Sequence, residues 1–201
     1  MIKALLILLL NLFNFWIVVR FRKANYISQF AARKIMHITT ALGCLVAVVI
    51  LSQYWYATVC LFFVLFYFAL HFGKKTRVLD SENHKSLGVP LYPVGLAIMS
   101  IFLWDNRIIH ILGILVLGIP DSLGAVVEEW VKPYASKYSR LIKFLVYYAL
   151  TASLLIFGLS LPLALGVGLF LAVVESVSPY GFDNLTVPIA FAISILILNV
   201  V

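Results

Sequence analysis

The sequence Glu175-Ser-Val-Ser-Pro-Tyr-Gly-Phe-Asp-Asn-Leu-Thr-Val-Pro188 separates two runs that contain no charged residue, 161–174 and 185–201. Pro179 and Gly181 predict the end of one helix, because neither residue is favoured inside a helix. Two apolar helices joined by a short polar turn are therefore expected at the end of the chain.

This turn contains acids next to hydrocarbon. Desolvating a carboxylate beside apolar surface is costly, so Glu175 and Asp183 indicate a polar pocket at a membrane surface. Asp183-Asn184 also offers a turn and a possible N-cap for the following helix. An ordinary ion pair for Glu175, and a plain cap and turn for Asp183-Asn184, are the structural alternatives.

The composition predicts a membrane protein. Hydrophobic residues make up 64% of the 201 residues, charged residues 11%, and the mean hydropathy is +1.08, whereas soluble domains contain about 45–50% apolar and about 25% charged residues. Long apolar runs in lipid must be helices, since the alternation of barrel strands is absent. We expect an all-α, polytopic transmembrane helical bundle, a single integral membrane domain over residues 1–201 with no soluble domain.

The apolar runs predict about eight spans, at 1–19, 36–52, 55–72, 88–104, 108–127, 144–159, 161–177 and 185–201. Several are near the lower limit of about 17 residues for crossing hydrocarbon, so seven spans are also possible. The basic cluster follows the first run instead of preceding it, which favours a retained span over a signal peptide.

The charges predict an orientation. Threading eight spans assigns the loops around 20–35, 73–87, 128–143 and 178–184 to one side, with 13 of the 15 Lys and Arg residues at those loops and their borders. The positive-inside rule places that face in the cytoplasm, with both termini outside the inner membrane. Seven of the eight acids lie on the same side, which is typical of a site for an anion and a divalent metal.

Arg33-Lys-Ile-Met-His37 forms a basic cluster at the mouth of the second run. Arg33 and His37 share a helix face, and Lys34 is three residues from His37. Such a cluster suits phosphate binding. A basic flank that contacts anionic lipid headgroups is the alternative reading.

The segment 84–95 contains two Gly and two Pro residues, which predict irregular or broken helix at the membrane boundary. Its backbone amides, including that of Gly88, are candidate phosphate ligands, and Lys85 supplies a charge. A kinked span without a ligand is the alternative. Farther along the chain, Gly166 and Gly168 indicate close helix packing.

A third cluster contains Asp121 and Glu128, seven residues apart and therefore on one helix face. Carboxylates so placed suit magnesium held together with nucleotide phosphates. Pro120 followed by an acid is also typical of a plain helix start. No Walker loop, G-x-G-x-x-G, H-E-x-x-H or G-x-S-x-G motif occurs in the chain.

Taken in order, these motifs resemble the polyprenol kinase family, which includes dolichol kinase, phytol kinase and the CTP-dependent diacylglycerol kinase. The resemblance covers about residues 30–190, and its last motif is the most specific. The matching residues are Arg33, Lys34, His37, Gly88, Tyr92, Pro93, Gly95, Gly118, Asp121, Glu175, Ser178, Pro179, Gly181, Asp183, Asn184 and Pro188. It implies magnesium-dependent transfer of a phosphoryl group from CTP, or another nucleotide, to the hydroxyl of a lipid alcohol.

The chain departs from the family pattern at two places. The family continues its Asp motif into a glycine-bearing turn, where this chain has 127–130 as Val-Glu-Glu-Trp. The family's K-S/T-x-E-G motif corresponds to 139–145 here, which lacks the Glu-Gly. Both departures concern contacts to the nucleotide.

The clusters and the resemblance together assign expected roles. Asp121 and Asp183 would hold Mg²⁺, with Glu175 and Glu128 as further metal ligands, and Asp183 would orient or deprotonate the hydroxyl. His37 is a weaker candidate base. The expected phosphate and nucleotide ligands are Arg33, Lys34, Lys85, Gly88 and Asn184. The expected partners are the nucleotide, a lipid alcohol and the membrane, without nucleic acid; a homo-oligomer is possible.

Other functions remain open at this point. A cytidylyltransferase that makes a CDP-lipid needs the same nucleotide, metal and membrane face, although its usual R-K-D and D-R-x-D acids are absent. A small-solute transporter would place ionisable residues at several depths. A lipid-binding protein without turnover is a further alternative. The sequence does not distinguish a prenol from diacylglycerol.

Overall fold

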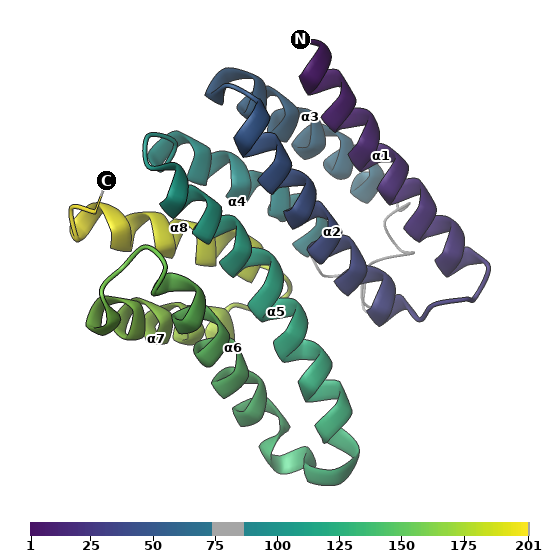
Figure 1. Ribbon diagram of the computed structural model, residues 1–201. Helices are drawn as coiled ribbons and strands as arrows, with labels where there is room; N and C mark the ends of the chain where they lie inside the picture. Colours follow the sequence, from purple (N-terminus) through teal and green to yellow (C-terminus); the bar gives the residue numbers. More distant parts are fainter. Residues whose placement is uncertain (74–86, 201) are drawn as a thin grey trace.

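The computed structural model describes residues 1–73 and 87–200, and this part of the chain is helical with no strand (Figure 1). This confirms the all-α class. The helices are α1 (Ile2–Lys23), α2 (Gln29–Ile50), α3 (Gln53–Phe72), α4 (Gly88–Phe102), α5 (Arg107–Ala135), α6 (Ser139–Leu155), α7 (Leu161–Val177) and α8 (Asp183–Ile197), with a 3-10 turn at Ser136–Tyr138.

Within the described residues, four helical segments are long and apolar enough to cross a membrane: α1, α2, α3 and the stretch Arg107–Leu155, which contains α5 and α6. The apolar helices α4, α7 and α8 are shorter, at 15 to 17 residues. Large apolar side chains such as Leu6, Val49 and Leu65 are exposed, as expected for helices that contact lipid. The described helices are compatible with a membrane protein, while eight crossings without a soluble part stay a prediction.

Two helices extend beyond their apolar runs. Helix α2 begins at Gln29, seven residues before the expected span, because the Ser28 hydroxyl caps it by accepting from the Ala31 amide at 3.1 Å. Helix α5 continues through Glu128 to Ala135, so most of the loop expected around 128–143 is helical instead. Both extensions place charged residues on helix faces and not in loops.

Helix α4 differs from the broken helix that its Gly and Pro residues predicted, because it is continuous from Gly88 to Phe102. Pro90 lies in the first turn, where a backbone amide has no partner within the helix. Pro93 lies inside the helix and removes one backbone hydrogen bond. The missing hydrogen bond at Pro93 is a local cost in stability. Helix α4 nevertheless stays helical there, and it packs against α3 and α8.

The turn between α7 and α8 forms where it was expected. Helix α7 ends at Val177, and Tyr180 and Gly181 adopt positive φ angles of 53° and 84°. The expected cap is absent, since Asp183 is the first helical residue and Phe182 takes the N-cap position without a side-chain hydrogen bond. Asp183 therefore has its carboxylate available for other contacts.

The helices form a closed ring of neighbours in the order α1, α2, α5, α6, α7, α8, α4 and α3, with α3 returning to α1 (Figure 1). Helices α2 and α5 lie side by side although α3 and α4 come between them in the sequence. The ring encloses two compartments, one among α1 to α4 and the other among α2 and α4 to α8. Helices α2 and α4 line both.

Glycines set two of these helix contacts. A Cβ on Gly95 of α4 would collide with the backbone oxygen of Asn184 in α8, and a Cβ on Gly168 of α7 would lie 3.2 Å from Ala152 of α6. The prediction of close packing is thus confirmed at Gly168. It is wrong at Gly166, where a Cβ would meet no atom within 4 Å because this residue points away from the other helices.

We expect Gly95→Ala to destabilise the protein by about 1–3 kcal/mol, because a backbone oxygen cannot move aside as a side chain can. Thermal unfolding in detergent measures the effect. Gly166→Ala is the matched control, and we expect no loss of stability there. Equal unfolding temperatures for the two variants would contradict the close contact between α4 and α8.

Candidate functional site

A cavity of about 560 Å³ opens among α2, α4, α5, α6, α7 and α8, a volume typical of ligand sites. In the part of the chain that the structure describes, five cationic and five acidic residues line it: Arg33, Lys34, Lys132, Arg140, Lys143, Asp121, Glu128, Glu129, Glu175 and Asp183. Such a density of both signs among apolar helices is typical of a functional site and not of packing.

Three carboxylates meet inside this cavity. Asp121 of α5, Glu175 of α7 and Asp183 of α8 each place one oxygen within 4.8 Å of the others. Asp121 and Glu175 are buried, at 6% exposure each. Like charges at this distance repel strongly away from water, so cations must balance them.

Lys34 provides one of these cations. Its Nζ lies 2.7 Å from Asp121 Oδ2 and also donates to the Asp121 backbone oxygen at 3.3 Å. Lys34 is itself only 6% exposed. The ammonium therefore directly neutralises one of the three acids, a contact that joins α2 to α5.

Lys143 provides the second cation, and the sequence reasoning did not select it as a site residue. Its Nζ lies 2.6 Å from Glu175 Oε1, and the aliphatic part of its side chain packs beside Gly124 of α5. Lys143 and Arg140 are three residues apart on α6 and both line the cavity. This spacing puts both cations on one helix face, and it was the sequence signal that could have identified Lys143 as a site residue.

His37 lies at the edge of the carboxylate cluster. Its Nδ1 is 3.5 Å from Asp121 Oδ2, too far for a good hydrogen bond. Its ring packs against Tyr92 of α4 with centroids 5.1 Å apart. Tyr92 of α4 thus holds the ring of His37, a residue of α2, with its Nδ1 atom toward Asp121.

Asp183 differs from the other two acids. Over residues 1–73 and 87–200 it makes no ion pair, whereas Asp121 and Glu175 each bind a lysine. Its carboxylate is partly exposed to the cavity. Asp183 is therefore the member of the cluster that is available to a ligand.

Hydrogen bonds fix the backbone around Asp183. Asn184 donates its side-chain amide to the Gly88 carbonyl at 2.8 Å, and the Leu87 amide donates to the Tyr180 carbonyl at 3.0 Å. The Asn184 Oδ1 atom is buried and has no hydrogen-bond partner in the described part of the chain. These bonds join the turn after α7 to the start of α4, with Gly88 and Asn184 both at the cavity wall.

The remaining predicted residues occupy different places. Arg33 lines the cavity at the α2 side. Glu128 also lines it but does not belong to the cluster of three carboxylates, so the geometry does not place it with the metal ligands. Lys85 lies outside the described residues.

Models of protein families, curated proteins and solved structures give no match to this chain. The resemblance to polyprenol kinases therefore depends on the residues of this chain alone. The arrangement of those residues has to carry any functional conclusion.

Proposed function

We propose that the protein is a membrane lipid-alcohol kinase, which transfers a phosphoryl group from a nucleotide, with CTP expected from the resemblance, to a lipid hydroxyl. One observation carries this proposal: the 560 Å³ cavity that holds Asp121, Glu175 and Asp183 adjoins an apolar pocket along α2. A charged substrate and an apolar one would thus meet at one place.

The donor set fits magnesium. Mg²⁺ prefers carboxylate oxygens together with phosphate and water oxygens, and each acid of the cluster offers an oxygen. Bound there, Mg²⁺ would neutralise charge on the transferring phosphoryl group. Asp183 and the second oxygens of Asp121 and Glu175 would hold the ion, since lysines contact Asp121 Oδ2 and Glu175 Oε1.

The residues of the chain suit the proton transfer as well. Asp183 accepts the proton of the lipid hydroxyl, whose oxygen forms a bond to the γ-phosphorus while the bond to the nucleotide's bridging oxygen breaks. The products are a lipid monophosphate and a nucleoside diphosphate. Arg33 of α2 and Arg140 of α6 both line the cavity and would bind phosphate oxygens, because guanidinium groups suit such anions.

We infer that all eight helices cross the membrane, the shorter ones with little tilt, because tilting would further reduce the thickness that 15 to 17 residues can span. The C-terminal end of α8 lies beside the α4–α5 connection, where Asn106 donates to the Val200 carbonyl at 3.0 Å. The cavity instead lies at the N-terminal ends of α4 and α8. With the cavity on the cytoplasmic side, as the basic residues predict, both termini are outside.

Incubation of purified protein with γ-labelled CTP, Mg²⁺ and either a prenol or diacylglycerol tests the function. We expect a labelled lipid phosphate and CDP, both abolished by EDTA and restored by excess Mg²⁺. Release of pyrophosphate with a CDP-lipid would identify a cytidylyltransferase instead. No labelled lipid with any nucleotide, together with solute flux into liposomes, would favour a transporter.

A further inference from the structure

The two lysines that balance the carboxylate cluster are held differently. Lys34 donates twice to Asp121, to Oδ2 at 2.7 Å and to the backbone oxygen at 3.3 Å, and 7% of its side chain is exposed. In the described part of the chain the Lys143 ammonium has one partner, Glu175 Oε1 at 2.6 Å, and 24% of its side chain is exposed. Lys34 is therefore fixed between α2 and α5, whereas Lys143 is more open to the cavity.

The side chain of Lys143 also suits a change of position. Its four-carbon stem is flexible and ends in a compact ammonium group that water solvates strongly. The stem lies beside Gly124 of α5, which has no side chain to enclose it. The Glu175 side chain is only 5% exposed. If this pair separates, the lysine is therefore the member that moves, and the acid stays among the helices.

The charge of the cluster indicates what would separate the pair. Three carboxylates against two ammonium groups leave one negative formal charge. A divalent cation added to this set would leave one positive charge, in a site where Asp121 and Glu175 are buried. Departure of one lysine makes the cluster neutral again. Lys143 has the weaker attachment, so it is the lysine expected to leave.

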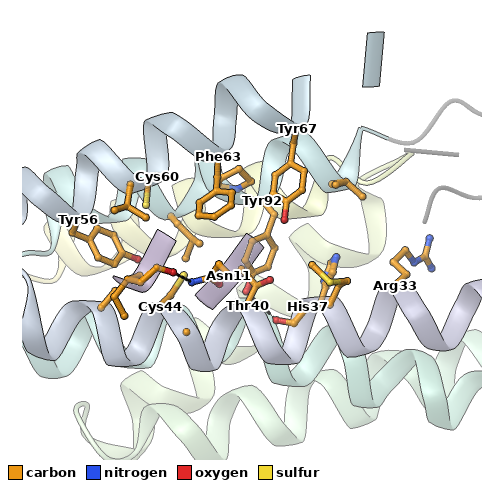
Figure 2. Close-up of a pocket in the computed structure, with 18 residues that line it drawn as sticks. Asn11, Arg33, His37, Thr40, Cys44, Tyr56, Cys60, Phe63, Tyr67 and Tyr92 are labelled. Carbon is orange, nitrogen blue, oxygen red and sulfur yellow. Dashed lines mark hydrogen bonds between the residues drawn. The ribbon is translucent and has the colours of Figure 1, made fainter. Parts of the chain in front are cut away.

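An unpartnered ring nitrogen points to a ligand at the same place. His37 is 8% exposed, and its Nδ1 atom, 3.5 Å from Asp121 Oδ2, has no hydrogen-bond partner among the described residues. Figure 2 shows the His37 side chain on α2 between Tyr92 and Arg33. Buried polar atoms usually have a partner. The Nδ1 atom therefore indicates a position for a cation, or for one of its water molecules, beside the carboxylates.

We propose that Lys143 is a displaceable counter-ion, which leaves Glu175 and turns into the cavity when a divalent cation binds to the three carboxylates. The inference rests on the metal site of the proposed function, which it deepens by assigning a control to that site. Before the exchange, Lys143 occupies one oxygen of Glu175. Afterwards both oxygens are available to the cation, and the cavity gains an ammonium group on the α6 face that carries Arg140.

Acetylation of lysines in the wild-type protein tests this exchange without a variant or turnover. The purified protein in detergent is treated with acetic anhydride at mildly alkaline pH, in Mg²⁺ or in EDTA, and each lysine is quantified by mass spectrometry. We expect Mg²⁺ to raise the acetylation rate of Lys143 by about tenfold, because a carboxylate contact favours the unreactive ammonium form by at least that factor. Unchanged acetylation of Lys143 in Mg²⁺ would overturn the proposal.

Two other lysines are internal controls in the same experiment. Lys34 is expected to stay unreactive in both conditions, because its two contacts to Asp121 are retained. Lys132, whose pair with Glu129 is exposed, is expected to react at the same rate in both. A rise in acetylation at Lys34 instead of Lys143 would identify the wrong lysine as the displaceable one and overturn the proposal.

A matched pair of variants measures the competition directly. Mn²⁺ takes the same oxygen ligands as Mg²⁺, and its binding is followed by electron paramagnetic resonance. We expect Lys143→Met to bind Mn²⁺ about tenfold more tightly than the wild-type protein, because a positive charge near the ion is removed. Lys132→Met makes the same change at an exposed pair on the cavity wall, and wild-type affinity is expected from it. Equal or weaker Mn²⁺ binding by folded Lys143→Met would overturn the proposal; if this variant does not fold, acetylation of the wild-type protein decides.

The outcomes separate this inference from the proposed kinase function. Acetylation of Lys143 that depends on Mg²⁺, without phosphorylation of any alcohol, supports the exchange and overturns the kinase. A labelled lipid phosphate, with Lys143 equally reactive in Mg²⁺ and in EDTA, leaves the kinase and overturns the exchange. Absence of Mn²⁺ binding by the wild-type protein would overturn both, since both require a metal at the three carboxylates.

Discussion

Asp183→Asn is expected to lower phosphoryl transfer by about 10³-fold, because removal of a general base typically costs 10²–10⁴-fold. Asp183 is the acid of the cluster without an ion pair in the described part of the chain, so its replacement by the isosteric Asn breaks no ion pair between helices. The unfolding temperature is therefore expected to stay near that of the wild-type protein. Single-turnover assays with labelled CTP measure the rate.

Asp105→Asn provides the control, since it makes the same chemical change in the exposed α4–α5 connection at the other end of the bundle. We expect wild-type rates from it. Undiminished transfer by Asp183→Asn would remove this residue from the mechanism. A matching fall in unfolding temperature would assign it a structural role instead.

Lys34→Met is expected to destabilise the protein by about 3–5 kcal/mol, because it leaves the Asp121 carboxylate buried without its main partner. Lys34 and Asp121 are each 6% exposed, and their contact at 2.7 Å joins α2 to α5. A large fall in thermal unfolding temperature in detergent is the expected measurement.

Two further variants identify the cause. Lys132→Met breaks the ion pair between Lys132 Nζ and Glu129 Oε2, which are 3.9 Å apart. The Lys132 side chain is 60% exposed, so this pair is expected to contribute only about 0–1 kcal/mol to stability. Lys34→Met combined with Asp121→Leu removes both buried charges, so stability should largely return while activity stays absent. A double variant no more stable than Lys34→Met would show that packing, not charge, explains the loss.

The presence of the helices could be predicted from the sequence, because long apolar runs that end at Pro, Gly or polar residues leave few other structures than a helix. Helix α7 spans Leu161–Val177, the range expected for it. Helix ends were less predictable where polar residues stay helical. The start of α2 depends on the Ser28 cap, and the end of α5 extends well past its apolar run.

The site was predictable as a set of residue types but not as a set of contacts. Asp121, Glu175 and Asp183 were all expected, and they do meet. Lys34 was expected to bind phosphate and Asp121 metal, yet they contact each other directly. Lys143 was not selected because its pairing with Glu175 depends on the packing of α6 against α7, which local sequence does not encode.

The order of helices in the ring has a consequence for how the chain is made. Lys34 emerges from the ribosome 87 residues before Asp121, which at 5–20 residues per second is roughly 4–17 s. During that interval α3 and α4 are synthesised, and Asp121, the carboxylate that pairs with Lys34 in the folded protein, has not yet been made. For the membrane protein that we propose, we therefore expect the Lys34 end of α2 to stay at the water interface, or with an insertion factor, until α5 lies beside it.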